Sequence, residues 1–300
     1  MLVYILTITL IVLQIIAGKL VFDRVSLPRW VTWLIVLLAY TTVHFASFSE
    51  TGFIRMVLLC SYLIAGMKWV VYSEWRRAGG VVLNWGRWSG FGFLWFGMDP
   101  AAWIKKKKNV SWKRDSLWGL GCLVFGLLTV AMLAHYQVQQ LVLLFVAMSV
   151  GFHYGALRLL TAFWRFCGIP VRVLFRNPLI TCGFADFWGK RWNLAYSQMM
   201  VRVVQRPLST LLGAKNSQFS VFAISGLLHE LAITVPVQAG YGLPTIFFLV
   251  QGLFTRLERR RSRWMGYLCI ISLLIGMPLL FPSAFVEAVI LPARDVFNLF

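Results

Sequence analysis

The feature that most constrains the fold of this chain is a series of long apolar runs. A helix needs roughly 20 mainly apolar residues to cross some 30 Å of hydrocarbon. It also satisfies its own backbone hydrogen bonds, which lipid cannot do for it. Runs of this kind lie near residues 1–18, 30–48, 53–73, 117–134, 139–160, 217–237 and 264–282, with a shorter one, the seventh in order, near 243–255. The sequence therefore predicts an all-α polytopic membrane protein.

The last segment, 283–298, leaves the expected number of transmembrane helices at eight or nine. It is apolar but carries Glu287, Pro292, Arg294 and Asp295. It is therefore compatible with a ninth span or with a helix at the membrane interface. The first run has no basic residues before it and no small-residue cleavage motif after it, so we expect a retained helix and not a signal peptide.

Composition and charge argue against a soluble protein and against a nucleic-acid-binding protein. Only 13% of the residues are charged and 59% are apolar, whereas a soluble domain carries about 25% charged residues. The net charge of +19 is compatible with a nucleic-acid binder, but such a protein gathers its basic residues on one accessible face. Here they come in bursts between apolar runs. We therefore expect a lipid bilayer, and no nucleic acid, as a partner.

The basic bursts predict the orientation of the chain. All but three of the 29 Lys and Arg residues lie in the four loops after the first, third, fifth and seventh spans. The intervening loops carry none of them: 49–52, 135–138 and 238–242. Because basic loops stay in the cytoplasm, we expect these four loops to be cytoplasmic and the N-terminus to face out. A bacterial inner membrane or an endoplasmic reticulum would suit this topology.

We expect a single membrane-embedded domain over 1–300, with N-terminal spans in 1–75, a cytoplasmic interfacial loop at 76–116 and a core at 117–300. That loop and the stretch 161–216 mix aromatic and basic residues, which is typical of interfacial helices. The tract Lys105–Lys108 is expected to contact anionic lipid.

Ionisable residues inside predicted spans are costly and need a physical reason. Arg55 and Lys68 lie near opposite ends of one run, and we expect them to extend to the headgroups. His44 is expected to be a hydrogen-bonded packing residue. His229 differs, because it lies about 12 residues into its span, roughly 18 Å at 1.5 Å per residue. Ser225 precedes it by one turn on the same face.

The neighbourhood of His229 argues against a metal site. A zinc protease motif would need a second histidine at position 233, which is Ile233. The five cysteines form no C-x-x-C pair, and no metal is expected. We expect Glu230 to pair with a basic or polar group on a neighbouring span. From these residues alone, His229 is either a buried histidine bonded to another helix or a functional group.

A second candidate segment runs from Asn177 to Asn193. Phe184, Phe187, Trp188 and Trp192 recur at helical spacing, which predicts an apolar stripe. We expect Asp186, Lys190 and Asn193 to share another face of the same helix, because they are spaced i, i+4 and i+7. The pattern alone predicts an amphipathic helix on the membrane surface.

These two segments together resemble a known family. The run Asp186-Phe187-Trp188-Gly189-Lys190-Arg191-Trp192-Asn193 is similar to the signature of the wax synthase branch of the membrane-bound O-acyltransferases. The stretch Ser225–Glu230 resembles its histidine motif. The segments 152–158 and 97–100 are also similar to the family. The resemblance is strongest over 150–260. Lys190 stands where the family more often has Arg, which keeps the charge.

The resemblance implies an enzyme that moves an acyl group from acyl-CoA to the hydroxyl of a lipophilic alcohol, in a fold enclosing a central catalytic tunnel. It implies no bound cofactor, since acyl-CoA is a co-substrate. His229 is the expected general base and Asn193 the second catalytic residue. The expected substrate-binding residues are Asp186, Trp188, Lys190, Arg191, Trp192 and Ser225. With Arg202, Lys190 and Arg191 are expected to attract the phosphates of coenzyme A.

An alternative from a different class is a transporter or channel with His229 and Glu230 as a relay at the membrane midplane. Such a protein would favour paired inverted halves, and the sequence contains no such internal repeat. The acceptor alcohol and the acyl length are left open.

Overall fold

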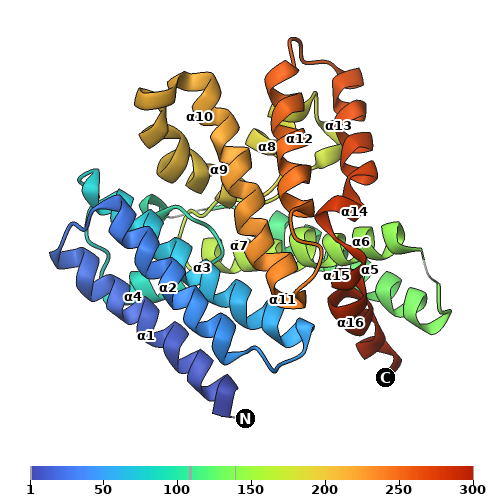
Figure 1. Cartoon of the computed structure of the whole chain (residues 1–300), viewed down its shortest axis with the longest axis horizontal. Coiled ribbons are helices and arrows are strands. Elements are labelled where there is room, and N and C mark those ends of the chain that lie inside the picture. Colours follow the sequence, from blue (N-terminus) through green and yellow to red (C-terminus); the bar gives the residue numbers. More distant parts are fainter. Residues whose placement is uncertain (1, 108–109, 139, 300) are drawn as a thin grey trace. The chain divides into compact units, whose positions relative to one another are not determined.

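The computed structural model describes residues 2–107, 110–138 and 140–299 (Figure 1). Met1, Lys108 and Gln139, which fall in segments discussed above, lie outside these residues. Within the described part of the chain every regular element is a helix and there is no strand, which confirms the all-α prediction. Five helical stretches are long and apolar enough to cross a membrane: Arg29–Ala46, Gly52–Arg77, Lys113–His135, Leu141–Phe166 and Leu194–Val237. The protein is a multi-pass membrane protein.

The chain folds into two compact units that alternate along the sequence. The first comprises the residues up to Ile104, Gln198–Arg256 and Pro278–Val289. The second comprises Lys105–Ser197, Leu257–Met277 and the residues from Ile290 onward. That both belong to one functional domain stays a prediction.

The first unit is organised around a long buried helix, α3. Its main helices are α1 (Leu2–Arg24), α2 (Arg29–Ala46), α3 (Gly52–Arg77), α4 (Trp85–Phe93), α10 (Arg206–His229), α11 (Val235–Val237) and α12 (Leu243–Leu257). Helices α1, α2 and α11 all pack on α3. Its side chains from Ala65 to Ser73 are all buried. Gly213, with φ +74°, interrupts α10, so the regular helix that carries His229 begins close to the expected span start at 217.

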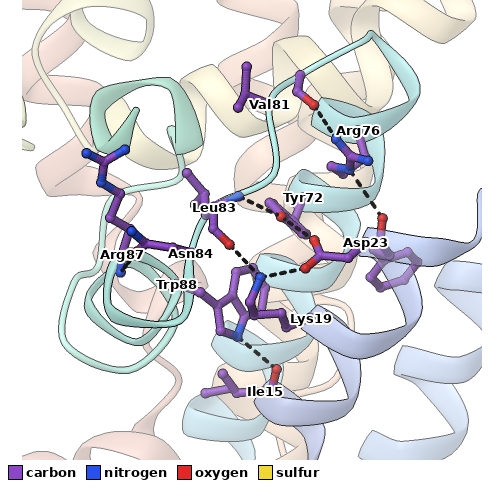
Figure 2. Close-up of polar contacts among 12 residues, drawn as sticks. Ile15, Lys19, Asp23, Tyr72, Arg76, Val81, Leu83, Asn84, Arg87 and Trp88 are labelled. Atoms are coloured by element: carbon purple, nitrogen blue, oxygen red, sulfur yellow. Dashed lines mark hydrogen bonds and ion pairs between the residues drawn. The ribbon is translucent and has the colours of Figure 1, made fainter. Parts of the chain in front are cut away.

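Polar contacts fasten the loop after α3 onto α1 and α3, as Figure 2 shows. The buried Lys19 ammonium donates to Asp23 and to the carbonyl of Leu83, each at 2.5 Å. The Tyr72 hydroxyl donates to the other carboxylate oxygen of Asp23 at 2.7 Å. The indole of Trp88, which is fully buried, donates to the carbonyl of Ile15 at 3.1 Å. The first part of the loop 76–116 is therefore packed against the unit.

Arg55 and Lys68 do not extend to the headgroups, so that prediction is wrong. Both side chains are buried, at 2% and 0% exposure. Lys68 donates to the carbonyls of Trp95 and Gly97 at 2.8 and 2.6 Å. Arg55 donates to the Pro236 carbonyl at 2.7 Å and to His44 Nδ1 at 3.1 Å. Backbone carbonyls on distant segments therefore take the place of lipid headgroups, and His44 is the hydrogen-bonded packing residue that we expected.

The second unit packs its helices through small residues. Its elements include α5 (Lys113–His135), α6 (Leu141–Ser149), the π-helical η2 (Val150–Ala156), α7 (Leu157–Phe166), α8 (Phe184–Lys190) and α13 (Arg263–Ile275), together with the first part of α9 (Leu194–Met200), which the unit boundary divides after Ser197. A Cβ on Gly126 would lie 2.5 Å from the Cα of Gly151, so α5 and η2 touch backbone to backbone. In a bilayer the hydrophobic effect does not drive helices together, and small residues let transmembrane helices associate through close van der Waals contact.

Candidate functional site: two motif segments

The helix that carries the histidine motif is closely packed where the motif lies. Gly226 of α10 faces α12, and a Cβ added there would lie 2.7 Å from the Cα of Thr245. The space beside Gly226 is thus filled by a helix. Ser225 is buried, and its hydroxyl donates to the carbonyl of Val221 at 2.7 Å. His229 is the last residue of α10, and the π-helical segment η5 (Glu230–Thr234) follows directly.

The half-buried His229 ring is held in a defined orientation. Its Nδ1 lies 2.7 Å from the carbonyl oxygen of Ser225. A carbonyl can only accept, so Nδ1 carries a proton, and in the neutral ring Nε2 is then the proton acceptor. The ring also packs at 4.2 Å, between centroids, on Phe248 of α12. The arrangement fixes which nitrogen can act as a base.

Glu230 bonds to a neighbouring helix, as its position in a span led us to expect. One carboxylate oxygen accepts from the backbone N–H and the hydroxyl of Thr245, at 3.0 and 2.8 Å. The other accepts from the Thr234 hydroxyl at 2.5 Å. Thr245 lies in the first turn of α12, whose free N–H groups and dipole favour a negative charge. Glu230 therefore caps α12. This contact gives the carboxylate a structural role that does not depend on the proton relay of the transporter alternative.

Replacing Glu230 with alanine should destabilise the protein by about 2 kcal/mol, since hydrogen bonds to a charged group each contribute on that order. The measurement is thermal unfolding in detergent. Replacement of the exposed Glu287 by alanine is the matched control and should change stability by less than about 0.5 kcal/mol. Equal melting temperatures for Glu230→Ala and the wild type would contradict the capping role.

The second motif segment differs from the expected continuous helix. Helix α8 ends at Lys190, where the N–H groups of Arg191 and Trp192 both donate to the carbonyl of Phe187, at 3.1 and 3.0 Å. Asn193 follows with φ +41°, in the left-handed region. The prediction that Asn193 shares a helical face with Asp186 and Lys190 is therefore wrong. The i, i+7 spacing assumed one helix from Asp186 to Asn193, but α8 ends at Lys190, about one turn before Asn193.

Asn193 begins the next helix. Its side-chain oxygen accepts from the N–H of Tyr196 at 3.1 Å and so caps α9. Because an N–H can only donate, this contact assigns the oxygen and leaves the amide nitrogen as a hydrogen-bond donor. Asparagine tolerates the left-handed backbone that most residues avoid, and such conformations cluster at functional sites.

Asp186 and Arg191 hold the turn between the two helices. Arg191 Nε donates to the buried Asp186 carboxylate at 2.6 Å, and Arg191 Nη1 donates to the Asn177 carbonyl at 3.2 Å. The N–H of Cys182 also donates to Asp186, at 3.2 Å. Burial alone would raise the pKa of Asp186, but the bonds from Arg191 and Cys182 outweigh it and lower the pKa. Lys190 is exposed.

Asp186→Asn should cost about 2 kcal/mol of stability at pH 7, because a charged hydrogen-bond partner is lost. A lowered pKa in the folded state gives stability that is present above the ordinary carboxyl pKa of about 3.9 and lost as the pH falls through the lowered value. The difference in melting temperature between wild type and variant should therefore shrink below about pH 4. The more exposed Asp295, changed to asparagine, is the control. A pH-independent difference would contradict the ion pair's role.

Aromatic side chains pack around this turn. Phe184, Phe187 and Cys269 of α13 form a buried cluster, and Trp188 and Trp192 pack against it. The apolar stripe is confirmed, and it packs on α13. Trp192 stacks on Phe187 with ring centroids 5.6 Å apart.

His153, a histidine outside the two motif segments, lies beside the second of them. Its ring lies in η2, 4.3 Å from Phe175 and 5.3 Å from Trp192 between centroids. His153 Nδ1 is 3.0 Å from the Ser149 hydroxyl. The histidine therefore borders the residue next to Asn193. The signal that could have identified it was the similarity of the segment 152–158 to the family.

The expected site residues divide between the two units. Ser225 and His229 belong to the first unit, and Asn193 with Asp186, Trp188, Lys190, Arg191 and Trp192 belongs to the second. Arg202 lies in the first unit, where it contacts Asp99 at 3.3 Å. In the described residues no three His, Cys, Asp or Glu side chains gather closely enough to hold a metal ion.

Both motif segments lie in the part of the chain that is similar to known proteins. The fold is that of an all-α multi-pass membrane protein. Its two distinctive segments are an aromatic-rich motif that ends in Asn193 and a long apolar helix that ends in His229. Residues 171–250, which include both Asn193 and His229, match the sequence model of the Membrane bound O-acyl transferase family. The resemblance is confirmed, and over this segment the chain is similar to the wax synthase branch of the membrane-bound O-acyltransferases.

Curated relatives agree with the family match. The chain is 31% identical over 109 residues to a probable long-chain-alcohol O-fatty-acyltransferase 2 of Arabidopsis thaliana, covering 33% of this chain and 32% of that protein. It is 33% identical over 92 residues to acyl-CoA–sterol O-acyltransferase 1 of the same plant, covering 28% and 27%. It is 27% identical over 100 residues to the long-chain-alcohol O-fatty-acyltransferase of Simmondsia chinensis, covering 30% and 28%.

The alignments therefore span about a third of the length of these curated relatives. No solved structure matches the chain.

Proposed function

We propose that this protein transfers an acyl group from acyl-CoA to the hydroxyl of a lipophilic alcohol. One observation carries the proposal: a single matched segment, 171–250, contains both Asn193 and a histidine whose ring is oriented through Nδ1. The names of the similar proteins refer to fatty-alcohol and sterol acylation. A long-chain alcohol or a sterol is accordingly the proposed class of acceptor.

The proposed base is His229. An alcohol is too weak an acid to attack a thioester at a useful rate, and a positioned neutral imidazole can take its proton. Nε2 accepts the proton as the alcohol oxygen bonds to the thioester carbon. The tetrahedral intermediate then collapses, the carbon–sulfur bond breaks, and the imidazolium returns the proton to the coenzyme A sulfur. Atoms and charges balance, and the histidine ends neutral.

Asn193 is proposed to donate a hydrogen bond from its amide nitrogen to the thioester oxygen, where negative charge develops. The cap on α9 supports this role, because it holds the amide with its nitrogen as the donor. Asp186, Trp188, Trp192 and Ser225 are proposed to shape the substrate sites.

The basic residues Lys190, Arg191 and Arg202 are proposed to attract the phosphates of coenzyme A from the cytoplasm. We further propose that the chain has eight to nine transmembrane helices, that its basic loops are cytoplasmic, and that the helices enclose a catalytic tunnel. A bacterial inner membrane or an endoplasmic reticulum would be the site of action.

The direct test offers the purified protein a panel of acyl-CoAs, from acetyl to long-chain, with fatty alcohols, sterols and terpenoid alcohols. Esters are identified by mass spectrometry, and free coenzyme A is measured in parallel. Ester formation that requires the protein is the expected result. Coenzyme A release without an ester, or no reaction across the panel, would reject acyl transfer to an alcohol.

A further inference from the structure

The helix that carries His229 does not continue as a regular α-helix. In η5 the N–H of Val235 donates to the carbonyl of Glu230, five residues earlier. In this register the N–H of residue 236 would serve the carbonyl of Leu231, but Pro236 has no N–H. That carbonyl needs a donor from outside its own helix, because lipid offers none.

Side chains from two other helices supply donors to this turn. The hydroxyl of Tyr40, on α2, donates to the Leu231 carbonyl at 2.5 Å, and Tyr40 is buried at 4% exposure. The thiol of Cys60, on α3, donates to the Ala232 carbonyl at 3.6 Å. These donors come from more than 170 positions away in the sequence, and all belong to the first unit.

The end of the same turn is held as well. Arg55 Nη1 donates to the carbonyl of Pro236 at 2.7 Å. Helix α11 ends at Val237, so this carbonyl belongs to the group that lacks partners inside a helix, and a cation there is favoured by the helix dipole. The wide turn after His229 is therefore fixed by side chains from its start to its end.

We propose that Tyr40 is a positioning residue for His229, acting through the carbonyl of Leu231. The inference rests on the proposed function, in which His229 is the base. The backbone path immediately after His229 sets the direction of its side chain, while Ser225 anchors the ring on the preceding turn. Without the hydroxyl, the Leu231 carbonyl is left unsatisfied and the turn must move to find a donor. Displacements of about 1 Å at a reacting group can cost up to a hundredfold in rate.

The test is Tyr40→Phe, measured as acyl transfer per folded protein with saturating and limiting substrates. We expect kcat to fall by about tenfold while both KM values stay within about twofold, because only the orientation of the base changes. The matched control is Tyr72→Phe. It removes another buried hydroxyl, which bonds to Asp23, about 18 Å further along α3 from Cys60 at 1.5 Å per residue. It should lower the melting temperature and leave kcat within about twofold.

A second pair of variants keeps the proposal testable if Tyr40→Phe does not fold. Cys60→Ser retains a donor and should keep kcat, whereas Cys60→Ala should lower it by about threefold, as the weaker thiol bond implies. Suppose that the wild-type protein transfers acyl groups and that His229→Ala is inactive. An unchanged kcat in Tyr40→Phe or Cys60→Ala would then overturn the positioning role and leave the proposed function standing. An inactive wild type would instead overturn the proposed function.

Discussion

Acyl transfer by the His229→Ala protein is expected to fall by roughly a thousandfold, because a general base contributes 10²–10⁴ to such a reaction. The loss should appear in kcat, since alanine leaves the substrate sites in place. His229→Asn sharpens the test: its side-chain amide nitrogen takes the position of Nδ1 and can still donate to the Ser225 carbonyl, which Nδ1 contacts at 2.7 Å, but it cannot take a proton. Both variants should be inactive.

The control for this prediction is His135→Ala, which removes an exposed histidine at the end of α5. Its activity should equal that of the wild type. Thermal unfolding of each variant in detergent separates loss of chemistry from loss of fold. If His229→Asn folded like the wild type and turned over at a comparable rate, the assignment of His229 as the base would be rejected.

Asn193→Ala is expected to slow acyl transfer by about a hundredfold, the size of effect found when one oxyanion donor is removed. It should also cost about 1 kcal/mol of stability, because the cap on Tyr196 N–H is lost. The two effects have different origins, since the side-chain oxygen caps α9 and the amide nitrogen is the proposed donor.

Asn193→Asp separates these two roles. Aspartate caps a helix as well as asparagine does, but it has no amide donor and adds a negative charge. We expect its melting temperature to match that of the wild type while its kcat falls at least as far as that of Asn193→Ala. A fully active Asn193→Asp protein would show that the side chain serves only the fold.

The two motif segments show how far pattern reasoning reaches. Helical spacing correctly predicted that Phe184, Phe187 and Trp188 of α8 pack together, because neighbouring residues on one helix face meet the same environment. Trp192 packs against the same cluster although it lies beyond the end of the helix. It failed for Asn193, because spacing cannot show where a helix ends. In the structure Arg191, directly after the helix, bonds back to Asp186 and to the carbonyl of Asn177.

Glu230 and Tyr40 show a second limit. A carboxylate in a predicted span required a polar partner, and the sequence indicated that much. That the partner is the first turn of α12 depended on how α10 and α12 pack. Nothing in the sequence around Tyr40 marked it, since its partner is a backbone carbonyl at Leu231.

By itself the sequence determined the apolar runs, the helical class and the two motif segments. These follow from residue chemistry acting over one or two helical turns. Only the tertiary structure decided that Arg55 and Lys68 are buried on backbone carbonyls and that Tyr40 bonds a carbonyl in the π-helical turn after His229. The physical reason is that backbone carbonyls are the same in every residue, so a side chain's carbonyl partner is set by packing between distant helices and leaves no trace in the local pattern.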